Sequence, residues 1–147
     1  MPVSRIILID ENTQEQGIAL EGTSSLVEAQ FVDRAGENVD LEAFSTLTCT
    51  LTNAIDGSVI NSRSSQSILN ANDGTVSDTG YLVLKLGPAD NVIVSGATEK
   101  GEVHFLQLDW TYTDTDTDPM TGQANFQFIV WPDQLSKGTD STKWLTA

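Results

Sequence analysis

His104 and Cys49 are the only histidine and the only cysteine, so they come first in a search for catalysis or metal binding. In the alternating stretch of residues 102–112, His104 lies on the same face as Leu106 and Leu108. Cys49 lies on the apolar face of the alternating stretch of residues 46–52. Both side chains are therefore predicted to point into a core. A tetrahedral zinc site needs more ligands than this pair supplies. The sequence also contains no Gly-x-Ser-x-Gly nucleophile elbow. We therefore expect no enzymatic activity, with His104 structural and Cys49 a small buried apolar residue.

Glu102 precedes His104 by two positions, so the two side chains share one face of a strand. An acid–base pair would need a cleft with a nucleophile beside it, and the sequence offers none. We expect Glu102 and His104 to hydrogen-bond a loop and to fix one end of a sheet.

Asp114, Asp116 and Asp118 alternate with threonines, and such carboxylates are the ligands that calcium prefers. An EF-hand loop that began at Asp114 would need glycine at its sixth position and glutamate at its twelfth, where this chain has Pro119 and Asn125. We therefore expect a solvated acidic hairpin tip that points away from any interface, and no cofactor. Weak cation binding by the same loop is the alternative.

The charge balance excludes several partners. The chain has 147 residues with 21 acidic and 7 basic side chains, a formal net charge of -14, and 39% hydrophobic residues, which is typical of one folded domain. The basic residues are scattered singly, so neither nucleic acid nor an anionic membrane is an expected partner. No apolar run approaches the roughly 20 residues of a membrane-spanning helix, and Asp10 and Glu11 interrupt any secretory signal.

Period-two alternation predicts the elements that position these residues. It is clear in residues 26–32, 46–52, 81–86, 102–112 and 123–131, and we expect the last two to be the central strands, joined by a polar connection over residues 113–122. Asp56-Gly57 predicts a hairpin into a strand at residues 58–61, and a short helical turn is expected at residues 65–69. About seven short strands separated by turn signals are typical of an antiparallel β-sandwich.

The two ends of the chain differ from the middle. We expect an N-terminal arm or edge strand over residues 1–19, a sandwich domain over residues 20–132 and a C-terminal arm over residues 133–147. The last of these is mostly polar but ends in Trp144-Leu145, an apolar pair that needs a place to dock. We expect that place to be a neighbouring subunit, and folding back onto its own domain is the alternative.

A series of turns and strand ends carries a resemblance to a known group of proteins. The series consists of residues 47–51, 56–63, 66–76, 82–91 and 102–105, within a stretch of roughly 20–132. It resembles the small immunoglobulin-like proteins encoded in the structural gene modules of tailed bacteriophages. The resemblance implies an immunoglobulin-like fold and a place in the virion, assembled in the host cytoplasm. It implies a non-enzymatic decoration or cement protein that binds the major capsid protein in many copies, or a neck or tail adaptor.

Two further expectations concern partners. A protein of a symmetric shell commonly forms a homo-oligomer, and at a net charge of -14 its interface must be apolar or must lie away from the acids. Trp131, Trp144 and Leu145 are the residues we expect to bind other virion proteins. A module that binds carbohydrate or a cell surface is the alternative, with Tyr81 and Trp131 stacking on sugar rings.

Overall fold

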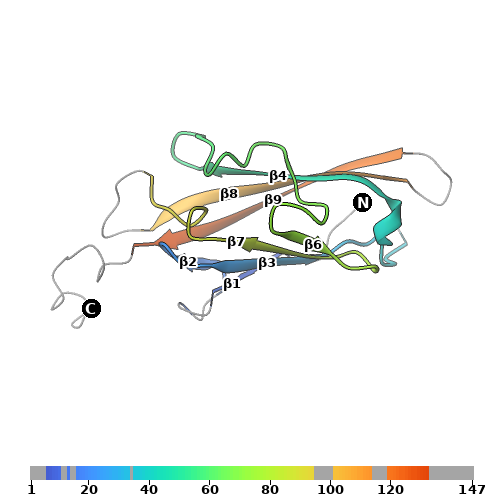
Figure 1. Cartoon of the computed structure of the whole chain (residues 1–147), viewed down its shortest axis with the longest axis horizontal. Coiled ribbons are helices and arrows are strands. Elements are labelled where there is room, and N and C mark those ends of the chain that lie inside the picture. Colours follow the sequence, from blue (N-terminus) through green and yellow to red (C-terminus); the bar gives the residue numbers. More distant parts are fainter. Residues whose placement is uncertain are drawn as a thin grey trace, which may run out of the picture.

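The computed structural model describes residues 6–10, 13, 16–33, 35–94, 101–113 and 119–132, and it is an all-β sandwich of two facing sheets (Figure 1). The first sheet has the order β1 (Ile7–Ile9), β3 (Ser25–Gln30), β7 (Tyr81–Leu86), β6 (Gly74–Val76). The second has the order β2 (Ile18–Leu20), β9 (Pro119–Trp131), β8 (Glu102–Thr113), β4 (Phe44–Asn53), β5 (Gln66–Ser67). One 3₁₀ turn, η1 (Leu41–Ala43), precedes β4.

The strand order is that of an immunoglobulin domain. If the strands are lettered A, A′, B, C, C′, D, E, F and G along the chain, the sheets read A-B-E-D and A′-G-F-C-C′. All neighbouring strands are antiparallel except β2 and β9, which pair in parallel. The predicted immunoglobulin-like β-sandwich is therefore confirmed, with nine strands in the described residues instead of about seven. The extra strands have two or three residues each, which is too short for alternation to reveal.

The predicted inner faces form the core. Alternate side chains of the long strands are buried and meet those of the opposite sheet, namely Val27, Ala29, Leu47, Cys49, Leu51, Leu82, Leu84, Leu86, Leu106, Leu108, Phe128 and Val130. At the end of the sandwich where β8 finishes, the Phe31 ring lies edge-on to Phe44 and Trp110, with centroids 5.1 Å apart in both pairs. Gly122 on β9 pairs with Trp110 on β8, and a Cβ at Gly122 would lie 2.3 Å from the indole nitrogen. This position therefore requires glycine so that the indole can pack beneath β9.

Three local predictions are wrong. The connection predicted over residues 113–122 is shorter than expected, because the pairing of β8 with β9 extends to Thr113 and Pro119. The sequence suggested a loop because the side chains that face solvent on this part of β9 are polar. The strand predicted at residues 58–61 is a single bridge between Thr52 and Val59, since the chain turns into positive φ at Asn61 and Ser62. Residues 65–69 contain β5 instead of a helical turn.

The N-terminal residues contribute an edge to each sheet. β1 borders the first sheet beside β3, and β2 borders the second beside β9. Asp10 lies between these strands and is buried, and its carboxylate accepts hydrogen bonds from the Leu20 amide at 3.0 Å and the Thr23 hydroxyl at 3.1 Å. For residues 1–19 we predicted an arm or an edge strand. The described part of this segment forms an edge strand in each sheet, and the buried Asp10 follows the first of them. The C-terminal residues 133–147 lie outside the described residues.

A buried ion pair joins the loops around the sandwich. The Arg63 guanidinium donates to both carboxylate oxygens of Asp90, at 2.6 and 3.1 Å, and both side chains are almost fully buried. Arg63 also donates to the Gln66 side chain at 2.9 Å and to the Asn72 carbonyl at 3.1 Å. Asp90 accepts in addition from the Gly87 amide at 2.8 Å. The pair therefore links the loop before β5, the turn before β6 and the loop after β7.

Arg63→Ala should strongly destabilise the fold because it leaves the Asp90 carboxylate buried without its cation. We expect a loss of about 3–5 kcal/mol in the free energy of unfolding, measured by urea denaturation. Asp73→Asn is the matched control, since Asp73 is 3.7 Å from the same guanidinium but is 63% exposed, and asparagine tolerates the positive φ of this position; we expect it to cost at most about 1 kcal/mol. Similar losses in the two variants would contradict the role given to the buried pair.

Candidate functional site

Glu102 and His104 are joined at the end of the second sheet where β8 begins. His104 Nε2 and Glu102 Oε1 are 2.7 Å apart, and both side chains are buried. The same Glu102 oxygen accepts the Val94 amide at 3.1 Å, and the His104 ring lies edge-on to Phe128. Within the described residues, His104 Nδ1 has no hydrogen-bond partner. The pair fixes the chain after β7 to the start of β8, so the predicted structural contact with a loop is confirmed.

Cys49 is buried on β4 next to the guanidinium of Arg63. Burial raises the pKa of the Cys49 thiol, and the positive charge of Arg63, 4.0 Å from the sulfur, offsets this only in part. A buried and protonated thiol is a poor nucleophile, in agreement with the predicted apolar role. No group of three or more metal-ligating side chains occurs in the described part of the chain, which does not include Asp114, Asp116 or Asp118.

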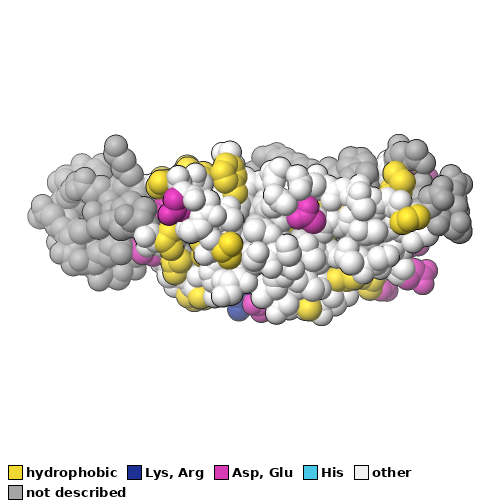
Figure 2. All heavy atoms as spheres, turned by 90° about the horizontal axis from the view of Figure 1, so that it is seen from above, with side chains coloured by type: hydrophobic (Ala, Val, Ile, Leu, Met, Phe, Trp, Pro, Cys, Tyr) yellow, Lys and Arg dark blue, Asp and Glu magenta, His cyan; other side chains and the backbone are white. Residues whose placement is uncertain are grey.

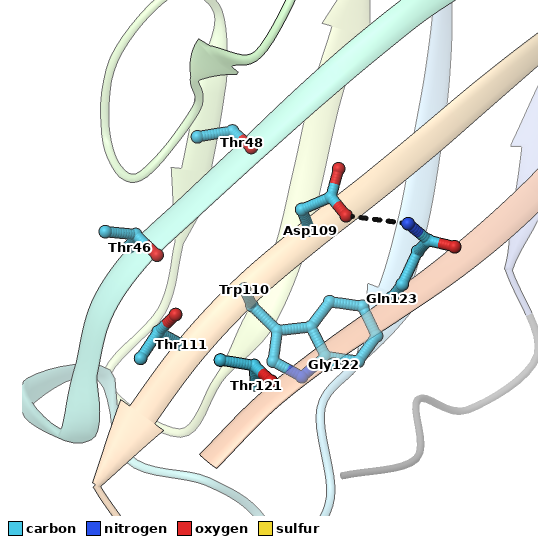
Figure 3. Close-up of a pocket in the computed structure, with 8 residues that line it drawn as sticks. All are labelled: Thr46, Thr48, Asp109, Trp110, Thr111, Thr121, Gly122 and Gln123. Atoms are coloured by element: carbon cyan, nitrogen blue, oxygen red, sulfur yellow. Dashed lines mark hydrogen bonds between the residues drawn. The ribbon is translucent and has the colours of Figure 1, made fainter. Parts of the chain in front are cut away.

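The outer face of the second sheet carries a shallow groove (Figure 3). Threonine hydroxyls from three strands line it, together with Asp109, Gln123 and backbone at Gly122, and Trp110 lies beneath β8 and β9. The Asp109 carboxylate accepts hydrogen bonds from Gln107 at 2.9 Å and Gln123 at 3.0 Å, the second of which Figure 3 draws. No histidine, cysteine or basic side chain lines this groove. The groove is therefore polar and nearly uncharged.

The groove belongs to a wider surface that we call the neutral face. It consists of the outward side chains of β4, β8 and β9, namely Thr46, Thr48, Thr50, Thr52, Phe105, Gln107, Asp109, Thr111, Thr121, Gln123, Asn125 and Gln127. Asp109 is its single charge. Figure 2 looks onto this side of the molecule, and uncharged white atoms cover most of the middle.

Exposed hydrophobic side chains gather beyond one end of the neutral face. We call this group the apolar end; its residues are Ile55, Val59, Val94, Ile129 and Trp131. Ile129 pairs with Val103, whose carbonyl accepts the Ala54 amide at 3.0 Å beside Ile55. Ile129 and Trp131 also lean over Gly101, where a Cβ would lie 2.2 Å from Ile129 Cγ2. Yellow side chains mark this region towards the left of Figure 2.

Acidic side chains occupy the opposite end of the sandwich, around η1. We call this group the acidic end; its residues are Asp33, Glu37, Asp40, Glu42 and Asp78. Backbone hydrogen bonds tie it together, from the Asp33 amide to the Glu37 carbonyl at 2.8 Å and from the Leu41 amide to the Asp78 carbonyl at 3.0 Å. The acidic end and the apolar end therefore lie at opposite ends of the long axis, although the exposed Asp56 lies in the same turn as Ile55.

The predicted binding residues have different positions. Trp131 is 43% exposed and belongs to the apolar end. Tyr81 is 37% exposed, but it lies on the outer face of the first sheet, where its hydroxyl donates to Glu28. The two aromatics are on opposite sheets and do not form a shared surface for stacking on a sugar. Trp144 and Leu145 lie outside the described residues.

Sequence reasoning missed the rest of the apolar end and the Arg63–Asp90 pair. Ile55, Val59 and Val94 are in turns and loops, where periodicity gives no information about direction. An apolar residue directly before the Asp56-Gly57 turn was the available signal. Arg63 and Asp90 are 27 positions apart, and no local pattern links them.

Comparisons with known proteins add nothing about function. No protein-family model and no curated protein sequence matches the chain. Among solved structures, the Lin-41 filamin domain is similar at 13% identity and a TM-score of 0.43, over 85% of this chain and 90% of that one. CopC from Methylosinus trichosporium OB3b is similar at 13% identity and a TM-score of 0.38, over 88% and 96%. The described residues include no helix long and apolar enough to cross a bilayer.

His104 should make the stability of the fold depend on pH. Burial lowers the pKa of His104, and the hydrogen bond and charge of Glu102 offset this only in part. The unfolded chain therefore takes up the proton first as the pH falls below about 6.5, which reduces stability by at most about 1.4 kcal/mol per pH unit. Urea denaturation at about pH 7.5, 6.5 and 5.5 measures this slope. His104→Gln should flatten the slope, and an unchanged slope in that variant would contradict the assignment.

Proposed function

We propose that this protein is a non-enzymatic structural component of a tailed-phage particle, an accessory protein that binds the shell of major capsid protein in many copies. Its working surface is the apolar end, which carries Trp131. The phage context comes from the sequence resemblance, and the surface comes from the distribution of exposed side chains.

The observation that carries the proposal is the exposure of Trp131 and Ile129 at one end of the longest strand. Both side chains leave a substantial part of their apolar surface in water, with 43% and 37% exposed. Aromatic side chains of this kind are enriched among the residues that dominate protein interfaces. Ile55 and Val59 extend the same patch and are also exposed. A protein partner of matching apolar surface would cover all four.

The position of the charges supports the same orientation. The acidic end lies at the opposite end of the domain from Trp131, and Asp56, in the turn between Ile55 and Val59, is an exposed acid beside the docking surface. A protein that docks by its apolar end would present the carboxylates of the acidic end to solvent, where their hydration is retained.

The number of copies per particle distinguishes the capsid from the neck and tail. A shell-binding protein repeats with the capsid lattice and reaches hundreds of copies, whereas an adaptor follows the small rings of the neck or tail. Quantitative protein gels of purified particles measure this number. Copies in the hundreds support the shell, a handful supports the adaptor, and absence from the particle overturns both.

Trp131→Ala should weaken binding of the purified protein to particles that lack it by at least about tenfold, because truncation of a central interface aromatic commonly costs more than about 1.4 kcal/mol. Tyr81→Ala is the control, since it removes an exposed aromatic from the other sheet. Co-sedimentation with particles over a range of protein concentrations measures both affinities. Equal binding of the Trp131 variant and the unmodified protein would contradict the proposed surface.

A further inference from the structure

We propose that the neutral face is a self-association surface, through which two copies of this chain form a weak dimer. The inference is independent of the phage context. It depends on the charge distribution, the chemistry of the side chains and the size of the face.

Charge is almost absent from the neutral face, although the chain has 21 acidic and 7 basic residues. The face has twelve outward side chains on three strands, and Asp109 is the single charged one. A different protein could use basic side chains to complement an acidic surface. A second copy has the same excess of 21 acidic over 7 basic residues, so a symmetric contact through an acidic surface would bring together more like charges than opposite ones. A surface with a single acid is therefore one on which two copies meet with little repulsion.

The side chains on the neutral face can bond to copies of themselves. A threonine hydroxyl and a glutamine or asparagine amide each contain both a donor and an acceptor, whereas a carboxylate only accepts. Six threonines, four amides and Phe105 account for every position except Asp109. Asp109 already accepts hydrogen bonds from Gln107 and Gln123 of its own chain, which reduces the cost of covering it. The face is thus self-complementary in hydrogen bonding.

The size of the neutral face sets the expected strength. Three strands about 4.8 Å apart, with four outward positions each spaced about 6.6 Å along the strand, give roughly 400 Å² of projected area per copy. This is below the roughly 800 Å² per partner of a standard specific interface. The sheets of two copies can pack face to face as they do in a sandwich. We therefore expect a dimer that forms and dissociates with protein concentration.

Analytical ultracentrifugation of the full chain over a range of concentrations tests the proposal. The unmodified protein should shift from monomer towards dimer as its concentration rises. Asn125→Glu and Asn125→Lys each place a charge on an exposed position of the face, midway along β9 and beside Gln107 of the central strand β8, and both should weaken dimerisation by at least about tenfold. Circular dichroism spectra of the variants establish that they remain folded.

Thr75→Glu and Thr75→Lys are the controls, because Thr75 is an exposed polar residue on the outer face of the first sheet. They change the net charge by the same amounts and should leave the dimer within about twofold of the unmodified protein. A protein that stays monomeric at all concentrations would overturn the proposal. So would unchanged association of the Asn125 variants, or tightening by Asn125→Lys to the same extent as Thr75→Lys, since net charge would then govern association.

Discussion

Arg63 and Asp90 meet inside the protein with paired contacts of 2.6 and 3.1 Å, and the position of several loops depends on this contact. Each would be costly to bury alone, so the loops that carry them are held where the pair can form. Gly87, Gln66 and Asn72 add further hydrogen bonds to the pair from three separate segments. The two-residue strand β5 and the three-residue strand β6 lie beside this network, which supports edges too short to be stable by pairing alone.

Similar buried polar contacts hold the other joints of the sandwich. Asp10 accepts hydrogen bonds where the chain passes from β1 to β2, and Glu102 accepts the Val94 amide where it enters β8. The five-stranded sheet presents a middle with Asp109 as its single charge and an apolar end, while several carboxylates collect around η1. The proposals for docking and self-association both follow from this separation.

Period-two alternation correctly predicted which side chains of the long strands are buried. It gave no information about loop residues, because the direction of their side chains depends on contacts with distant parts of the chain. Leu47, Cys49 and Leu51 were placed inside correctly, because their neighbours on β4 are threonines that face water. Loop residues such as Val94 carry no period, so their exposure could not be foreseen. The pairing of Arg63 with Asp90 could not be predicted either, because the sequence does not distinguish a buried arginine from an exposed one. The strand order could not be read from periodicity either, since it depends on which edges β1 and β2 join.

The central claim is that a chain with a net charge of -14 meets its own copy through the face that carries only one of its acids, Asp109. A dilution series of ¹⁵N–¹H NMR spectra tests this most directly, because concentration-dependent shifts identify the contact without any substitution. The account predicts that the largest shifts lie in residues 46–52, 105–111 and 121–127. Shifts confined to β3, β6 and β7, or spectra that do not change with concentration, would contradict it.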